Sequence, residues 1–214
     1  MEKPGRDEQR LRKAMAIEFD RTFKASSKLR KWGYLKPTAF VRRGAWFVAF
    51  HPTIWVDARR SELGISVKPF ALDDLVSRIM LHDGLDDTPL SLRARGPHCL
   101  VRPMFVGSIE SDGRDVREMD ALANRFADES LDRVAGMTLD DFIEFTRDDV
   151  PPGKASVNHV AALILVGRHR EAMQLCDMAI STKQWGGPAR IDERGATTGF
   201  FELAGRWIGR EALA

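Results

Sequence analysis

The chain has 214 residues, of which 43% are hydrophobic and 30% are charged. This composition predicts a packed core and excludes wholesale disorder. The formal net charge of +2 excludes a uniformly basic or acidic protein, and the length suits one large domain or two small ones.

The charge is unevenly distributed along the chain. Residues 1–43 carry 13 Lys/Arg against 5 Asp/Glu, whereas residues 110–149 carry 5 Arg against 13 Asp/Glu. A basic and an acidic segment in one chain can serve two different partners, or they can face each other in the fold. The second alternative is favoured, because exposed charge of one sign is usually a solvated face.

Cysteine content and hydropathy exclude several classes of protein. Cys99 and Cys176 lie far apart without a C-x-x-C spacing, which argues against a disulfide framework and a cysteine zinc site. The first residues are charged, with no apolar segment typical of a signal peptide. The longest aliphatic run, residues 161–166, is too short to span a bilayer. We therefore expect a cytoplasmic protein with no membrane partner.

Residues 5–31 form the first predicted helix. One apolar stripe consists of Leu11, Met15, Phe19 and Phe23, spaced four residues apart. Basic residues occupy the rest of the surface, and Lys24, Lys28 and Lys31 are the candidate nucleic-acid contacts. The favoured alternative is an amphipathic helix packed on a sheet, because no aromatic residues interleave the basic face.

Residues 38–70 are the most strand-like stretch and predict the centre of an antiparallel sheet of four or five strands. Two apolar runs flank Gly44, as in a tight hairpin. We expect His51-Pro52-Thr53 to interrupt the second strand, because proline cannot donate to a ladder. A short helix after Asp73-Asp74 and a further strand over residues 98–106 complete this half.

The second half is predicted to be helical. Residues 116–134 trace one apolar helix face, and Thr138 begins a capping signal with an acid three residues later. Residues 155–180 form a helical hairpin whose turn resembles that of a single tetratricopeptide repeat, although position 184 is Gln instead of the closing proline. We predict an α+β fold, with a sheet domain over 1–112 and a helical region over 113–214 packed on the sheet as one compact unit.

Catalytic, cofactor and metal motifs are not found, so we predict no catalytic, cofactor-binding or metal-binding residues. His51 could form an acid–base set with Asp57 and Glu62 if the fold brings them together, and a candidate enzyme site lies near His51, Asp57 and His98. The favoured interpretation of His51 is a polar residue at a strand break. The acidic pairs, among them Asp140-Asp141, are interpreted as helix caps.

Five tryptophans accompany a single tyrosine. Trp32 and Trp185 lie beside glycine in expected loops, and exposed tryptophan is common at binding hot spots. These two residues are therefore candidates for a contact surface, together with Lys24, Lys28, Lys31, Asp140 and Asp141.

The first half resembles a bacterial family catalogued as a domain of unknown function, number 4304 in that series. The resemblance covers about half of the chain and follows four features: Gly33-Tyr34 after the first helix, the aromatic hairpin from Phe40 to Phe50, Leu63-Gly64-Ile65, and Cys99-Leu100-Val101-Arg102. It implies an α+β domain with an antiparallel sheet and carries no catalytic residue. Related small domains look like immunity or partner-binding proteins.

Three functions remain open from the sequence. The leading expectation is a non-enzymatic, immunity-like protein-binding module that uses the acidic helices at 116–149 or the 155–180 hairpin. The alternatives are nucleic-acid binding through the basic first helix, and an enzyme with a site near His51.

Overall fold

The computed structural model describes residues 5–55, 60–81, 84–85, 88–95, 99–111, 115–186, 189–191 and 195–211. The chain divides into two compact units. The sheet unit comprises Met1–Val67 and Phe105–Gly136, and the helical unit comprises Lys68–Met104 and Met137–Ala214. This grouping differs from a division at residue 112, because each unit is built from two separate stretches of chain. Packing of the two parts as one compact unit stays a prediction, and each unit is described by itself.

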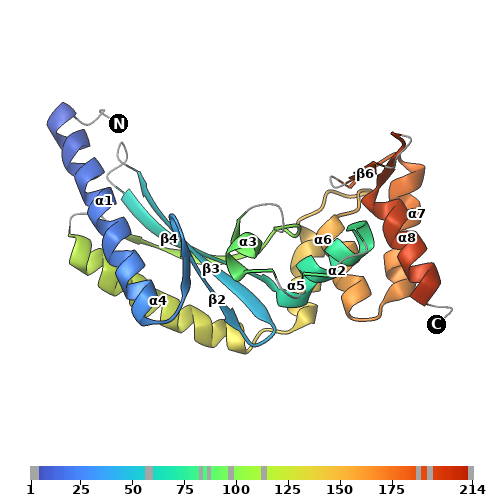
Figure 1. Cartoon of the computed structure of the whole chain (residues 1–214), viewed down its shortest axis with the longest axis horizontal. Helices are drawn as coiled ribbons and strands as arrows, with labels where there is room; N and C mark the ends of the chain where they lie inside the picture. Colours follow the sequence, from blue (N-terminus) through green and yellow to red (C-terminus); the bar gives the residue numbers. More distant parts are fainter. Residues whose placement is uncertain are drawn as a thin grey trace. The chain divides into compact units, whose positions relative to one another are not determined.

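A five-stranded sheet confirms the predicted α+β fold (Figure 1). Its strands are β1 (Gly33–Leu35), β2 (Thr38–Arg43), β3 (Trp46–Trp55), β4 (Arg60–Pro69) and β5 (Met104–Ser111). They lie in chain order, and β2 pairs antiparallel with both β1 and β3. Gly44 has a φ of +58° at the β2–β3 turn, a conformation that costs glycine little.

Two long helices flank the sheet in the sheet unit: α1 (Arg6–Leu29) and α4 (Val116–Ala135). They pack against each other, and α4 also contacts β2 and β3 (Figure 1). Phe19 and Phe23 on α1 and Met119 on α4 are buried, as expected for apolar residues at helical spacing. The two predicted helices are therefore confirmed.

Two predicted features of the sheet are wrong. β3 runs unbroken through His51-Pro52-Thr53, because β2 begins at Thr38 and Pro52 lies beyond its end, so no bond to β2 is lost. The strand predicted over 98–106 starts only at Met104. The amides of Leu100 and Val101 donate to the Asp73 carboxylate, which removes them from a ladder.

The helical unit contains six helices and a small antiparallel sheet among its described residues. The helices are α2 (Phe70–Leu81), α3 (Leu90–Ala94), α5 (Leu139–Asp148), α6 (Val157–Leu165), α7 (His169–Ser181) and α8 (Phe200–Glu211). The strands are β6 (Ala189–Ile191) and β7 (Thr197–Gly199). The small sheet was not predicted from the sequence, because each strand has only three residues.

Helix α6 is the centre of the helical unit and contacts α2, α5, α7 and α8. Residues 160–164 are all buried, which matches their continuous apolar character. The predicted hairpin is confirmed: α6 and α7 pack together across a turn in which Gly167 has a φ of +78°. Helix α2 contacts both α6 and α8, so it covers these two helices from within the helical unit.

In the part of the chain that the structure describes, no helix is long and apolar enough to cross a membrane.

Candidate binding surface

A groove of about 220 Å³ lies at the C-terminal end of α7 in the helical unit. We call it the Trp185 groove. Its lining residues come from α7, the loop after it, β7 and the start of α8: Ile180, Lys183, Gln184, Trp185, Thr197, Gly199, Phe201 and Glu202. The groove therefore combines apolar walls with a cation, an anion and two neutral polar side chains.

Two glycines allow the chain at residues 185–186 to pack closely against its neighbours. A Cβ on Gly199 would lie 2.7 Å from the Trp185 carbonyl oxygen, and a Cβ on Gly186 would lie 2.8 Å from the ring of Phe201. Gly186 also has a φ of +75°, which favours glycine. The backbone of the loop is thus seated on buried Phe201, while the indole of Trp185 is left outside.

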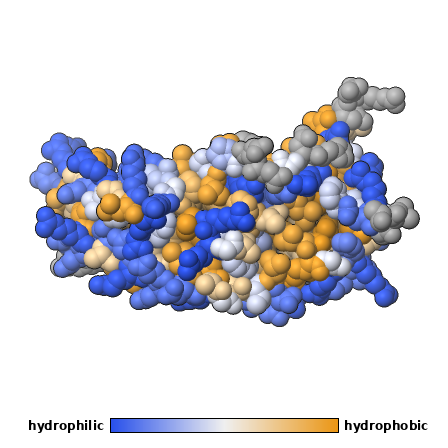
Figure 2. Space-filling model, turned by 60° about the horizontal axis from the view of Figure 1, so that its bottom comes forward, coloured by the Kyte–Doolittle hydropathy of each residue, from blue (hydrophilic) through white to orange (hydrophobic). Residues whose placement is uncertain are grey.

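Apolar side chains at this end of the helical unit are unusually exposed. Trp185 is 59% exposed, Ile180 at the end of α7 is 42% exposed, and Ile191 on β6 is 68% exposed. Figure 2 shows apolar residues gathered on the surface of the helical unit, whereas the surface over α1 and α4 is mostly hydrophilic. Exposed apolar side chains that cluster are a feature of contact surfaces.

Trp32 does not share this exposure. Its ring stacks on Phe50 of β3 with 4.7 Å between centroids, and the Arg30 guanidinium lies 4.9 Å from the Trp32 ring. Trp32 is half-buried and packs at the edge of the core of the sheet unit. The two candidate tryptophans thus have different roles, which sequence could not distinguish because both follow a helix and adjoin glycine.

Lys24, Lys28 and Lys31 are exposed in the sheet unit. Ser26 on α1 donates to Asp120, and Arg30, the residue directly after α1, donates twice to Asp128; both carboxylates belong to α4. The hydrogen bonds from Arg30 lower the pKa of Asp128. The basic and acidic segments therefore do face each other where α1 meets α4, as the charge distribution favoured.

Asp140 and Asp141 lie in the first turn of α5, and both are exposed. Asp141 and Thr138 form the predicted capping box, with the Asp141 amide donating to the Thr138 hydroxyl. Hydrogen bonds from Thr138 lower the pKa of Asp141. This arrangement explains Asp141 as a cap and gives it no need of a partner.

His51 is on β3, and its ring lies between the hydroxyl groups of two residues on the neighbouring strands. Its Nε2 is 2.7 Å from Ser66 Oγ on β4, and its Nδ1 is 3.3 Å from Thr38 Oγ1 on β2. Burial lowers the pKa of His51, so the ring is neutral at pH 7. Ser66 is buried, which denies a substrate access to this Ser–His pair. Asp57 and His98, the other two residues of the candidate enzyme site, lie outside the described residues.

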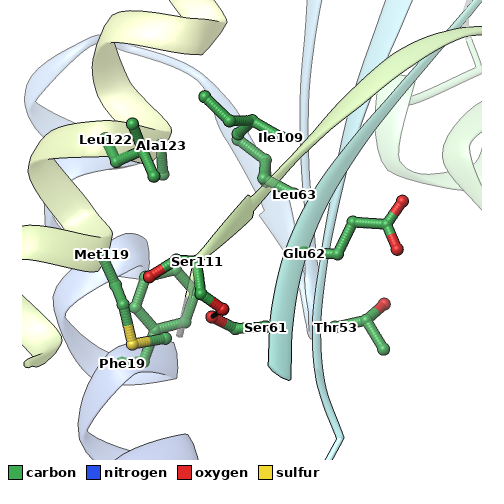
Figure 3. Close-up of a pocket in the computed structure, with 10 residues that line it drawn as sticks. All are labelled: Phe19, Thr53, Ser61, Glu62, Leu63, Ile109, Ser111, Met119, Leu122 and Ala123. Atoms are coloured by element: carbon green, nitrogen blue, oxygen red, sulfur yellow. Dashed lines mark hydrogen bonds between the residues drawn. The ribbon is translucent and has the colours of Figure 1, made fainter. Parts of the chain in front are cut away.

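A cavity of about 20 Å³ in the sheet unit has room for about one water molecule (Figure 3). Phe19, Met119 and Leu122 face Leu63 and Ile109 across it. Glu62 and Thr53 point away from the helices in Figure 3. The cavity is therefore a gap in an apolar core, with no carboxylate aimed into it.

Sequence reasoning missed a buried polar network in the helical unit. Lys68 forms an ion pair with Asp73 and donates to the carbonyl oxygen of Arg93, 3.0 Å away. Arg93 in turn donates to the carbonyl oxygens of Phe70 and Leu85. Asp73 lies in the first turn of α2, as predicted for an acid at a helix start, and it is also a partner of Lys68 and of the 100–101 backbone. In the sequence, this network is indicated only by the lysine within the predicted strand 63–68.

Among the described residues, no group of three or more His, Cys, Asp or Glu side chains could hold a metal ion. No family model matches the chain, no curated protein matches it, and no solved structure matches it. The resemblance of the first half to the family of unknown function stays a prediction.

Proposed function

We propose that this chain is a non-enzymatic protein-binding module of the cytoplasm, and that its partner contacts the Trp185 groove. The observation that carries the proposal is the indole of Trp185, which is 59% exposed although the chain beside it packs closely against Gly199 and Phe201. A tryptophan side chain has few torsions, so it loses little conformational freedom when it is ordered on binding.

The lining of the groove indicates the kind of partner. A tryptophan that shares the groove lining with Ile180 favours a segment of protein that presents an apolar side chain. Lys183 and Glu202 provide a cation and an anion beside the apolar contact. Such a polar rim fixes orientation more than it adds affinity. We include in this proposal an immunity-like protein, which binds one dedicated partner.

Site-specific photo-crosslinking tests the proposal. A photoreactive phenylalanine analogue replaces Trp185, and in a parallel chain it replaces Arg170, which is exposed near the start of α7, whereas the groove lies at the other end of this helix. After irradiation in the source cell, we expect one protein to be crosslinked from position 185 and not from position 170. Mass spectrometry of the crosslinked band identifies it.

Two further variants complete the test. With the identified protein purified, Ile180→Ser should weaken its binding to the full chain by about tenfold, since a buried aliphatic contact contributes about 1.4 kcal/mol or more. Arg170→Ser, at an exposed position of the same helix, should leave the affinity unchanged. Equal crosslinking from positions 185 and 170, or equal affinity of both variants, would disprove a contact at the groove.

An enzyme with a site at His51 has less support. The imidazole bonds to two hydroxyls on neighbouring strands, and the hydroxyl nearest to it belongs to buried Ser66. Both contacts suit a histidine that satisfies its hydrogen bonds within a sheet.

A further inference from the structure

Six cationic side chains form a continuous line along the exposed face of α1. The line consists of Arg6, Arg10, Lys13, Ile17, Arg21, Lys24 and Lys28, and we call it the basic stripe. Successive members are three or four residues apart, so they lie on one face of the helix. All seven are exposed, and Ile17 is the one uncharged member.

The acidic residues of α1 avoid this line. The helix has four of them, Asp7, Glu8, Glu18 and Asp20, and none occupies a stripe position. Asp20 accepts a hydrogen bond from Tyr34 and pairs with Lys36 at 3.4 Å. Arg10 lies 3.9 Å from Asp7, but both side chains are more than 80% exposed, so this pair is weak. The stripe therefore keeps its positive charge.

Part of the opposite face of α1 is already occupied by contacts within the sheet unit. Phe19 and Phe23 are buried, and Ser26 and Arg30 bond to α4. Of the apolar stripe only Leu11 is exposed, at 61%, which leaves less apolar area to insert into a bilayer interface than an amphipathic anchor has. The stripe also lacks an aromatic side chain on which the bases of a single strand could stack. These features favour a ligand recognised through charge alone.

We propose that the basic stripe binds the phosphate backbone of double-stranded nucleic acid, independently of sequence. From Arg6 to Lys28 the stripe spans about 33 Å at 1.5 Å per residue, which is close to one turn of a duplex. Six cations over one turn supply the electrostatic contacts of non-specific binding. The inference is independent of the Trp185 groove, which belongs to the other unit.

Salt-dependent binding of the full chain to a labelled 25-base-pair DNA duplex of arbitrary sequence tests the proposal. Fluorescence anisotropy gives the affinity between 50 and 200 mM KCl. The stripe variant carries Arg10→Gln, Lys13→Gln and Arg21→Gln. Each lost phosphate contact lowers the slope of log K against log salt by about 0.9, so the variant should lose up to about 2.7 of that slope.

The matched control carries Lys154→Gln, Arg170→Gln and Arg206→Gln, three exposed positions of the helical unit that remove the same charge. It should keep the wild-type slope, and circular dichroism should show both variants folded. Three outcomes overturn the proposal: no duplex binding at 50 mM KCl, an equal loss of slope in both variants, or tighter binding to a single strand or to phosphatidylserine vesicles than to the duplex.

Discussion

Lys68 and Asp73 form an ion pair inside the helical unit, with 2.6 Å between Nζ and Oδ2 and each side chain only 1% exposed. The other carboxylate oxygen of Asp73 accepts the amides of Leu100 and Val101. Lys68 also donates to the Val101 carbonyl oxygen, 3.4 Å away. The pair thus fixes the irregular chain around residue 100 against the end of β4 and the start of α2.

Replacement of Asp73 by asparagine should strongly destabilise the protein. The new carboxamide retains an oxygen for the two backbone amides but leaves the Lys68 ammonium buried without its counter-charge. Breaking a buried pair from one side costs about 3–5 kcal/mol, which urea unfolding followed by tryptophan fluorescence would detect. The double variant with Lys68→Met removes both charges, so we expect it to be more stable than Asp73→Asn alone. A double variant that is less stable than the single one would show that the pair contributes through the hydrogen bonds of Lys68 instead.

Gly33 is required by the ring of Phe40 on the neighbouring strand. The two residues are partners in the β1–β2 register, and a Cβ on Gly33 would lie 2.1 Å from the Phe40 ring. We expect Gly33→Ala to lower the free energy of unfolding by about 1–3 kcal/mol, as overpacking does. Phe40→Leu in the same chain should recover part of this loss by removing the ring. If Gly33→Ala unfolds at the wild-type urea concentration, the ring moves aside freely and the contact is unimportant.

The sequence predicted the elements whose cause is local. α1, α4 and the α6–α7 hairpin follow from apolar spacing, and Thr138 with Asp141 follows from the capping pattern. The features that it missed depend on contacts distant in the chain. The residues around 100 form no strand because Asp73 takes their amides.

The candidate binding residues also divide into those that local sequence predicts and those that depend on distant contacts. The basic residues of α1 are visible in the sequence, since helical spacing alone places them on a face. Trp32 and Trp185 look alike in the sequence, but they differ in exposure. The ring of Trp32 stacks on Phe50, whereas at Trp185 it is the neighbouring Gly186 that packs on Phe201. Each contact joins residues at least 15 positions apart, which periodicity cannot detect.

His51 should make the protein less stable in mild acid. Burial lowers its pKa in the folded state below the ordinary value of about 6.5, so the unfolded chain binds the proton more readily. The contribution of neutral His51 to the free energy of unfolding is complete above pH 6.5. It is lost as the pH falls from 6.5 toward the pKa of His51 in the folded state. The loss is at most about 1.4 kcal/mol per pH unit for one proton.

Urea unfolding at pH 7.5 and 5.5 measures this dependence. His51→Gln keeps hydrogen-bonding groups near Thr38 and Ser66 but does not titrate, so its stability should change less with pH than that of the wild type. His159 also has a pKa lowered by burial, and His159→Gln should reduce the dependence separately. Identical pH dependence in His51→Gln and the wild type would mean that His51 is already accessible to protons in the folded state.

The Arg30–Asp128 pair should contribute modestly to the docking of α1 on α4. Arg30 makes two hydrogen bonds to the carboxylate, one of them 2.9 Å long, but the Asp128 side chain is 58% exposed. Exposed pairs contribute about 0.2–1 kcal/mol, and two-point geometry favours the upper end. We expect Asp128→Asn to lower the free energy of unfolding by no more than about 1 kcal/mol. The loss should be smaller at 1 M salt, where the charges are screened.

Arg30→Gln should cost more than Asp128→Asn, because the guanidinium also lies 4.9 Å from the Trp32 ring. A double-mutant cycle separates the two effects. The coupling energy between Arg30→Gln and Asp128→Asn reports the ion pair, and the excess cost of Arg30→Gln reports the contact with Trp32. A coupling energy of zero at low salt would show that the ion pair does not hold the helices together, and that the other contacts of α1, among them buried Phe19 and Phe23, do so.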